Sequence, residues 1–492
     1  MKKYFLYLLL GTSVVISCSK DDDAITAGNG PIADPSANVP TQDFMWKAMN
    51  LWYFWQADVP NLADDRFTSD AEYTTFLQSE ADPGNFFNNK LRFGEDRFSV
   101  FSDDYKEFTN ALSGITKSNG LSFGLLGLDN DMVAGYVRYV TPDSDAASKD
   151  ISRGEFFTGV DGQALNLNNY IDLLFGANDT YTLNMADYDG STYTLNGKEV
   201  TLTKQEGFQE NPIFIVNSYD INGQKIGYLY YNRFLNEFDE QLNNAISQLK
   251  SQGITDLVLD LRYNPGGSVN STRLLASMIY GTNTNDLFIR QRWNPKIQAA
   301  LGPEALEDYF ADRTGAGTAI NSLNLNRLYV LTTNRSASAS ELLINGLDPY
   351  MEVIQVGTTT TGKNEFSLTM VDDPGRPGAP YVYTLSRESS INPENTWALQ
   401  PLLGRNENSV GFSDYTAGLI PEIELEEDLS NLGILGDLNE PLLAKAIEAI
   451  TGISGKRDFT VKRPARPFAD TEIFTPLRDN MILDKPINLT IQ

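Results

Sequence analysis

Residues 334–363 read NRSASASELLINGLDPYMEVIQVGTTTTGK, and the predictions for the rest of the chain build on this stretch. Small residues and hydroxyls lead into Glu341 and an apolar segment with three-to-four spacing, which predicts a loop followed by a helix. MEVIQVG then favours a short buried strand ending at Gly357, and a run of threonines with Gly362 precedes Lys363. We hypothesise that a serine at this helix start and Lys363 form a nucleophile–base pair.

Three serines compete for the role of nucleophile: Ser336, Ser338 and Ser340. A serine at a helix start is commonly an N-cap, whose side chain accepts a hydrogen bond from a free backbone N–H. Each of the three, taken alone, is therefore read more simply as a cap or a loop residue, and the choice among them depends on the rest of the chain.

Residues 357–363 also approach the pattern of a phosphate-binding loop after a strand. The Ser or Thr required after the lysine is replaced by Asn364, and the next residues should form a helix. Instead Phe366, Leu368 and Met370 alternate as in a strand. We therefore expect no nucleotide binding.

Composition excludes several classes of function. The chain has 492 residues, which suggests about two to four domains. Its net charge of −27 argues against nucleic-acid binding and is read as a self-repelling surface. The absence of histidine excludes a Ser-His-Asp triad and His-ligated zinc, and the one cysteine excludes intrachain disulfides. We expect no metal and no other cofactor.

Residues 1–17 have the pattern of a secretory signal peptide, with Lys2 and Lys3 before an apolar run. The run ends in Val-Ile-Ser-Cys, which resembles a bacterial lipobox and implies lipidation at Cys18; the alternative is an ordinary signal peptide with an incidental cysteine. The following Ser-Lys-Asp-Asp-Asp resembles the surface-export signal of Bacteroidetes lipoproteins. We expect residues 18–40 to be a flexible tether and the protein to be lipid-anchored to the outer membrane, exposed at the surface if the export signal functions.

Residues 41–113 are expected to form a helical N-terminal domain. Asp43 is a candidate cap for a helix that Pro60 stops, and further helices are expected near 71–78 and 83–89. Aromatic residues cluster between Trp46 and Trp55; at helical spacing they favour core over a ligand platform.

Residues 114–205 are expected to form a small β-rich domain, with strands at 137–140 and 181–185, a strand ending at Val160 and a helix near 167–174. The segments LSFGLLG, TPDSDAA, RGE and VDG occur in an order that resembles a circularly permuted bacterial PDZ domain. The resemblance implies a site that binds an extended peptide at Ser122, Phe123, Gly124 and Leu125; the alternative is a spacer. Residues 129–131 start like an EF-hand loop, but the later Gly and Glu are missing.

Residues 213–455, after a polar link at 206–212, have the order of an α/β domain. Strands are expected at 225–231, 255–262 and 327–332, with a helix at 239–250. Chemistry in such sheets sits at the carboxyl ends of strands. Two regions remain less defined: 294–320, a candidate specificity insertion, and the extended C-terminal segment 456–492.

Motifs in this domain carry a more specific resemblance. DLRYNPGG, NRSASASE and TTTTGK, followed by YTAGLIPEIEL and GDLNEPLLAKAIEAI, are similar to the C-terminal processing (tail-specific) serine peptidase family. The resemblance covers roughly residues 43–452 and implies a crotonase/ClpP-like α/β peptidase domain.

In that family the middle serine of the run is the nucleophile, here Ser338, and the lysine of the GK segment is the base, here Lys363. The backbone N–H groups of Ala339 and Gly267 would form the oxyanion hole. Many members carry a lysine-orienting glutamine four residues after the lysine, where this chain has Ser367. The resemblance implies a serine endopeptidase that recognises C-terminal or unfolded segments of proteins; the alternative is a non-catalytic peptide-binding lipoprotein on a peptidase fold.

Overall fold

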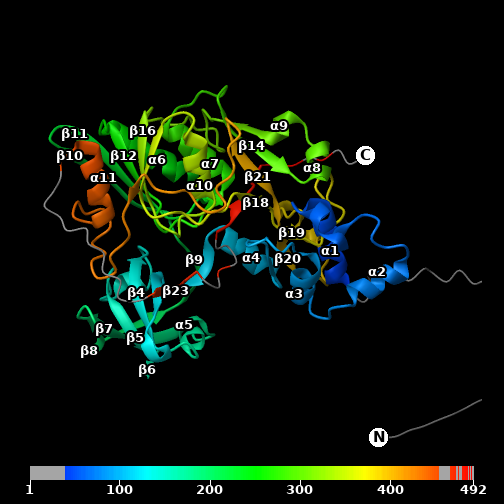
Figure 1. The fold of residues 1–492 in the computed structure, drawn as a ribbon, viewed down its shortest axis with the longest axis horizontal. Coiled ribbons are helices and arrows are strands. Elements are labelled where there is room, and N and C mark those ends of the chain that lie inside the picture. Colours follow the sequence, from blue (N-terminus) through cyan, green and yellow to red (C-terminus); the bar gives the residue numbers. More distant parts are fainter. Residues whose placement is uncertain are drawn as a thin grey trace, which may run out of the picture.

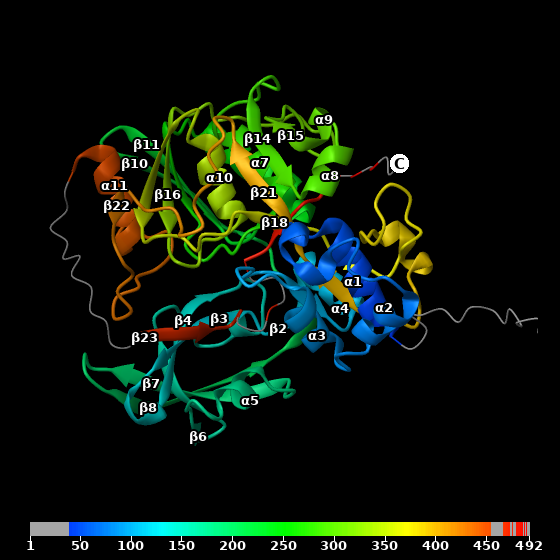
Figure 2. The same cartoon turned by 45° about the vertical axis from the view of Figure 1, so that its right-hand side comes forward.

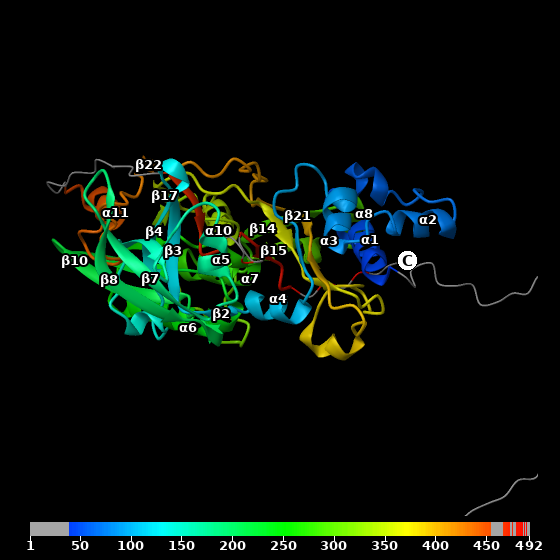
Figure 3. The ribbon, with the colours of Figure 1, turned by 90° about the horizontal axis from the view of Figure 1, so that it is seen from below.

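The computed structural model describes residues 39–453, 466–472, 475, 479–485, 487 and 489. Cys18 and the rest of the expected signal peptide lie outside the described residues. Figure 1 shows an α/β body, a β-rich unit below it and N-terminal helices to one side. Seen from below in Figure 3, the N-terminal helices and the β-rich unit lie toward opposite ends. The predicted mixed helix-and-sheet, multidomain organisation is confirmed.

Short helices build the N-terminal part: α1 (Pro40–Trp52), α2 (Asp70–Leu77), α3 (Pro83–Phe86) and α4 (Tyr105–Leu112). Asp43 does not cap α1 as the sequence predicts. The helix starts earlier, at Pro40, whose missing N–H is not needed at this position, and Asp43 lies in the first turn, 2.7 Å from Lys47. Trp52 and Tyr53 are fully buried, so these two aromatic residues belong to the core.

The β-rich unit is one sheet with strand order β23-β3-β4-β5-β7-β8, in which β6 pairs with β5. Its elements are β3 (Leu121–Gly127), β4 (Val133–Val140), β5 (Phe156–Val160), β6 (Gln163–Ala164), α5 (Tyr170–Phe175), β7 (Thr180–Tyr188), β8 (Tyr193–Thr203) and β23 (Arg466–Asp470). β23 comes from the far end of the chain and lies beside β3 (Figure 2).

The segment 206–212 is not simply a polar link. Its first residues belong to β9 (Gln205–Gln209), which pairs antiparallel with β2 (Ile115–Ser118). Polarity alone does not reveal strand pairing, but the backbone of this segment pairs with a strand about ninety positions earlier, with Phe208 opposite Thr116. The two strands tie the β-rich unit to the helix α4 before it and to the body after it.

The body contains a sheet with strand order β10-β11-β12-β16-β17-β22, in which only β10 is antiparallel to its neighbour. These strands are β10 (Ile213–Ile221), β11 (Gln224–Tyr231), β12 (Asp256–Asp260), β16 (Arg327–Thr332), β17 (Glu352–Gly357) and β22 (Ile423–Glu424). Helices cover both faces: α6 (Asp239–Ser251), α7 (Val269–Ile279) and α10 (Ala339–Leu347) pack on one, and α11 (Pro441–Thr451) packs on the other. Burial on both faces accounts for the continuous apolar runs of β11 and β12.

Two further sheets complete the fold. The first has the order β13-β24-β18-β21-β14-β15, from β13 (Gly267–Ser268), β14 (Leu287–Trp293), β15 (Glu307–Tyr309), β18 (Glu365–Ser367), β21 (Leu402–Asn408) and β24 (Met481–Ile482). The second contains β1 (Val100–Ser102), β19 (Met370–Val371) and β20 (Ala398–Gln400). Within 294–320 lie α8 (Pro295–Ala300) and α9 (Pro303–Leu306). No helix in the described part of the chain is both long and apolar enough to cross a bilayer.

A buried ion-pair network joins the end of β12 to the start of α11. The guanidinium of Arg262, fully buried, donates to Asp260 and, at 2.6 and 2.9 Å, to both carboxylate oxygens of Glu440. Glu440 in turn caps α11 by accepting from the backbone of Leu443 at 2.8 Å. Because only Tyr263 separates Arg262 from the turn that holds Gly267, the network also fixes where that turn begins.

We expect Arg262→Met to lower the free energy of unfolding by about 3–5 kcal/mol, since it leaves two buried carboxylates without their cation. Urea unfolding followed by tryptophan fluorescence measures this. The control is Arg290→Met, which breaks a partly exposed pair with Glu307 and should cost less than about 1 kcal/mol. Equal losses in the two variants would contradict the structural role given to Arg262.

Candidate active site

Three loops meet where parallel strands of the body sheet end. The NPGG turn (residues 264–267) follows β12, the nucleophile loop (residues 333–338) follows β16, and the lysine loop (residues 358–363) follows β17. Neighbouring parallel strands end at the same edge of a sheet, so the three loops converge there. The backbone of Ala337 donates to the carbonyl of Asn264 at 3.1 Å, and that of Thr361 donates to the carbonyl of Ser336 at 3.0 Å.

The three candidate serines differ in what their hydroxyls do. Ser336 Oγ donates to the carbonyl of Leu261 at 2.8 Å, and Ser340 Oγ donates to the carbonyl of Asn264 at 3.0 Å. Ser338 Oγ is buried and has no hydrogen-bond partner among the described residues. A buried hydroxyl without a hydrogen-bond partner destabilises the folded state, and such groups are typical of catalytic residues. The geometry therefore favours Ser338 over Ser336 and Ser340 as the candidate nucleophile.

Ser338 also has a strained backbone. Its φ is 62° and its ψ is −111°, a conformation that costs a non-glycine residue about 1–3 kcal/mol. It stands directly before α10, so the amide of Ala339 is the first of the helix and shares the partial positive charge of the N-terminus. An oxyanion forming beside Ser338 would lie close to this amide.

The NPGG turn can be built only with glycine. Gly267 has a φ of 133°, and a Cβ there would lie 2.1 Å from the carbonyl oxygen of Phe234. A Cβ on Gly266 would lie 2.7 Å from Ser338 Cβ and 3.0 Å from the Ala339 nitrogen. The side-chain amide of Asn264 holds the turn by donating to Tyr231 and accepting from Gly266, both at 2.9 Å. The absence of a side chain at Gly266 thus lets the turn lie directly against Ser338 and Ala339.

Lys363 is fully buried, and burial lowers its pKa to about 8. Its Nζ lies 5.1 Å from the centre of the Phe98 ring, which belongs to the N-terminal part of the chain. Asp96 fixes this loop by accepting from the backbones of Phe98 and Ser99 at 3.0 and 2.9 Å. The N-terminal part therefore helps to exclude water from the lysine.

One carboxylate holds the nucleophile loop and the lysine loop together. Glu341 Oε2 accepts from the backbone amides of Ser338 and Lys363, both at 2.8 Å. Its Oε1 accepts from Gly362 N at 2.6 Å and Thr360 Oγ1 at 2.5 Å. Glu341 is fully buried; burial raises its pKa to about 7 although the four donors act in the opposite direction. The sequence predicted Glu341 only as the start of a helix.

Ser338 Oγ and Lys363 Nζ are not hydrogen-bonded to each other among the described contacts. Lys363 Nζ instead donates to Asn480 Oδ1 at 3.1 Å, and the Gly267 amide donates to the Asn480 carbonyl at 2.8 Å. Ser367 does not contact the lysine amine through a hydrogen bond: its Oγ donates to the carbonyl of Met481 at 3.1 Å and accepts from Gln400 at 2.9 Å. No sequence signal indicated that Asn480 and Met481 lie at this site.

Ser122, Phe123, Gly124 and Leu125 lie in β3, all buried. They are paired with the chain itself: Gly124 and Leu125 stand opposite Asp470 and Ala469 of β23, and the Thr471 amide donates to the Phe123 carbonyl at 3.1 Å. These four residues therefore line a strand edge that carries an added antiparallel strand.

Two family models match parts of this chain. Residues 225–376 match the model of Peptidase family S41, and residues 41–100 match the model of the Peptidase S41 N-terminal domain. The first match contains the NPGG turn, Ser338, Glu341 and Lys363, and the second contains Phe98.

Curated relatives match about a third of this chain. A protein of Staphylococcus aureus (strain N315) named as a CtpA-like serine protease is 26% identical over 178 residues, which cover 35% of this chain and 33% of the relative. The carboxyl-terminal-processing peptidase 3, chloroplastic, of Arabidopsis thaliana is 32% identical over 155 residues, covering 30% and 26%. The chain thus spans about a third of the length of the curated relatives it matches. A crystal structure from Bacteroides fragilis NCTC 9343, assigned to the S41 proteases, covers 84% of this chain and 97% of its own, with 26% identity and a TM-score of 0.64.

We expect Glu341→Gln to lower kcat/KM by about thirtyfold or more, because an amide turns its NH₂ toward two of the four donors and leaves them unpaired. Steady-state cleavage of an unstructured protein measures this. The control is Glu422→Gln, an exposed carboxylate that accepts from the backbone of Gln355 at 2.7 Å. Similar losses of kcat/KM in both variants would contradict a specific role for Glu341 in the site.

Glu341→Gln also tests how Glu341 contributes to the pH dependence of the free energy of unfolding. Burial raises the pKa of Glu341 from 4.5 to about 7, so the folded state binds the proton more tightly than the unfolded state. The stability from this group is therefore present below pH 4.5 and lost as the pH rises through about 7. Urea unfolding across this range should show a loss in the wild type that Glu341→Gln lacks. Parallel pH profiles would contradict it.

Proposed function

Since the chain carries both a peptidase S41 domain and the S41 N-terminal domain, we propose that it is a serine endopeptidase that cleaves peptide bonds in protein substrates with Ser338 as nucleophile and Lys363 as base. One observation carries the proposal. A buried, unpartnered serine hydroxyl and a buried lysine of lowered pKa have their backbones bound by the same carboxylate, that of Glu341.

In the proposed reaction, neutral Lys363 takes the proton from Ser338 Oγ as that oxygen attacks the carbonyl carbon of the scissile bond. The amides of Ala339 and Gly267 donate to the oxyanion, and the lysine ammonium then gives its proton to the leaving amine. Water, activated by the same amine, hydrolyses the acyl-enzyme. A lysine can act in this way only if desolvation keeps much of it neutral, which the lowered pKa supports.

We further propose that the β-rich unit is PDZ-like and presents C-terminal or unfolded segments of substrates. The strand β23, added antiparallel along β3, supports this reading. The signal pattern and Cys18 support a lipoprotein of the cell envelope, anchored to the outer membrane.

Ser338→Ala and Lys363→Ala should each lower cleavage of an unfolded protein by at least about a thousandfold. Mass spectrometry of the products gives the rate and the cleaved bonds. The matched control is Ser340→Ala, which loses one hydrogen bond to the backbone and should stay within about tenfold of the wild type. Unchanged cleavage by Ser338→Ala would rule out Ser338 and Lys363 as the catalytic dyad. A chain that binds peptide but cleaves nothing in any form would instead be a peptide-binding lipoprotein.

The pH dependence of kcat/KM tests whether Lys363 acts as the base. Since the pKa of Lys363 is about 8, kcat/KM should rise with pH through about 8 as the amine loses its proton, then level off. Lys363→Arg should be inactive across the range, because the guanidinium stays protonated. A profile that is flat between pH 6 and 9 would contradict the role of Lys363.

Membrane attachment is tested by Cys18→Ser. We expect the wild type in the outer-membrane fraction and labelled by a lipid precursor, and the variant released and unlabelled, because the acyl chains supply the attachment. Retention of the unlabelled variant in the membrane would contradict lipid anchoring at this residue.

A further inference from the structure

The part of the chain beyond α11 returns to the site. We call residues 466–472 and 479–485 the C-terminal segment. Its first part, β23, runs antiparallel along β3, with Ala469 opposite Leu125 and Asp470 opposite Gly124. The strand therefore occupies the edge that an extended peptide would use, and it leaves no second edge on β3, because β4 pairs with the other side.

Two side chains seat β23. Ala469 is 1% exposed and packs into the core of the β-rich unit. The carboxylate of Asp470, also buried, lies 3.3 Å from Arg138 and 2.9 Å from Arg335. Arg138 belongs to β4 and Arg335 to the nucleophile loop. One acidic side chain thus bridges the peptide-binding edge and the loop that carries Ser338.

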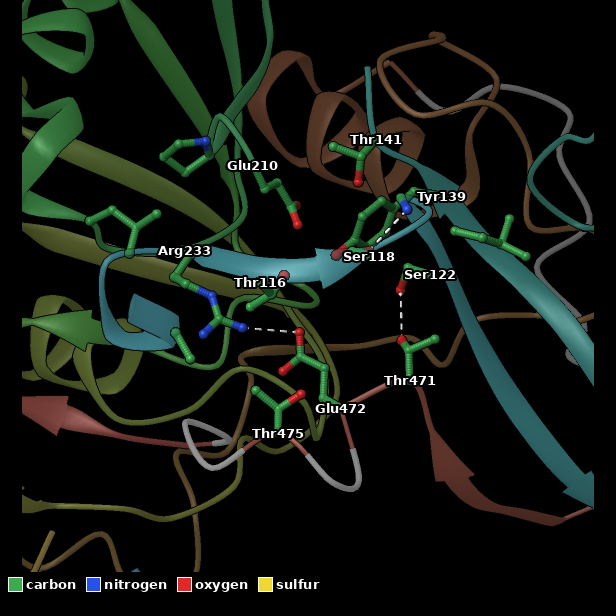
Figure 4. Close-up of a pocket in the computed structure, with 16 residues that line it drawn as sticks. Thr116, Ser118, Ser122, Tyr139, Thr141, Glu210, Arg233, Thr471, Glu472 and Thr475 are labelled. Atoms are coloured by element: carbon green, nitrogen blue, oxygen red, sulfur yellow. Dashed lines mark hydrogen bonds and ion pairs between the residues drawn. The ribbon is translucent and has the colours of Figure 1, made fainter. Parts of the chain in front are cut away.

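Beyond β23 the segment lines a cavity of about 120 Å³ between the β-rich unit and the body. In Figure 4, Glu472 points to Arg233, 3.1 Å away, and the hydroxyls of Thr471 and Ser122 face each other at 3.4 Å. Glu210 also lines this cavity, and burial raises its pKa to about 7. The segment is therefore held between the β-rich unit and the body by polar contacts of its own side chains.

Further on, the segment reaches the reacting groups. Asn480 accepts from the amide of Gly267 with its carbonyl and from Lys363 with its side chain. Met481 and Ile482 form β24, which lies between β13 and β18 and pairs with both. A backbone carbonyl bound to an oxyanion-hole amide, on an extended strand held between two others, is what a peptide substrate would present.

We infer that the C-terminal segment occupies the path of an extended peptide substrate, and that Arg138 and Arg335 form the subsite that holds it by an acidic side chain. This rests on the proposed function. A substrate must displace the segment from β3, from Gly267 and from Lys363 before Ser338 and Lys363 can form their hydrogen bond. Because the segment is tethered, its effective concentration is on the order of millimolar, and free peptides bind only in proportion to the displaced fraction.

The opposite reading is that Asn480 completes the site by orienting Lys363, in place of the glutamine that the sequence lacks at Ser367. The two readings predict opposite signs. Displacing the segment raises activity if it occupies the substrate path. It lowers activity if Asn480 is needed to orient Lys363.

The first test is Asp470→Lys in the full chain, which puts a cation against Arg138 and Arg335 and displaces β23. We expect kcat/KM on an unstructured peptide to rise at least about tenfold, and a synthetic peptide of residues 466–492 to reverse the rise competitively. The same peptide with Asp470→Asn should inhibit at least about tenfold more weakly. The control is Asp150→Lys, the same charge change at a carboxylate that is 93% exposed in the β-rich unit. A fall in activity, or no inhibition by added peptide, overturns the inference.

A second variant does not depend on the folding of the first. Gly127 and Arg466 stand opposite each other in β3 and β23, so Gly127→Cys with Arg466→Cys, in a Cys18→Ser background, links the two strands on oxidation. We expect the oxidised form to lose at least about tenfold in activity and to regain it on reduction, while each single-cysteine variant is insensitive. Full activity in the cross-linked form overturns the inference.

Binding separates this inference from the proposed function. If no form cleaves, the peptidase proposal fails, but a fluorescent peptide of residues 466–492 still reports on the groove. Binding to Asp470→Lys at least about tenfold tighter than to the wild type supports the inference, and equal binding or none to either overturns it.

Discussion

The site depends on one buried carboxylate. Glu341 accepts hydrogen bonds from the backbones of Ser338, Gly362 and Lys363 and from the hydroxyl of Thr360. These donors lie on two loops that follow different strands, β16 and β17. A carboxylate has acceptor sites for all four donors, whereas an amide does not. Since Glu341 belongs to the first turn of α10, the helix that supplies the Ala339 amide also holds the backbones of Ser338 and Lys363 close together.

Exclusion of water gives the two ionisable groups of the site their properties. Burial lowers the pKa of Lys363 to about 8 and raises that of Glu341 to about 7, because the charged form of each is disfavoured away from solvent. Part of this cover comes from Phe98, outside the α/β body. The N-terminal part therefore helps to keep Lys363 away from solvent by packing, without supplying a hydrogen bond to the lysine amine among the described contacts.

Sequence patterns identified what depends on local chemistry. The NPGG turn requires glycine for its positive φ values, and the serine run and the glycine before Lys363 stand where strands end, so all three motifs were found without coordinates. Other features lacked a local signal. The residues from Gln205 to Gln209 look polar and unstructured, yet they pair with β2. Asp43 looks like a cap, yet Pro40 starts the helix three residues earlier.

The sequence by itself determined the order of the central strands and helices of the α/β domain, the loops that follow those strands and the exclusion of histidine chemistry, because these follow from periodicity, residue type and composition. Only the tertiary structure decided which serine hydroxyl lacks a partner, that Glu341 joins the two loops and that Asn480 lies between Gly267 and Lys363. Hydrogen bonds that depend on how loops and strands meet in space leave no periodic trace in the chain, whether they join residues 22 positions apart, such as Glu341 and Lys363, or 117 apart, such as Lys363 and Asn480.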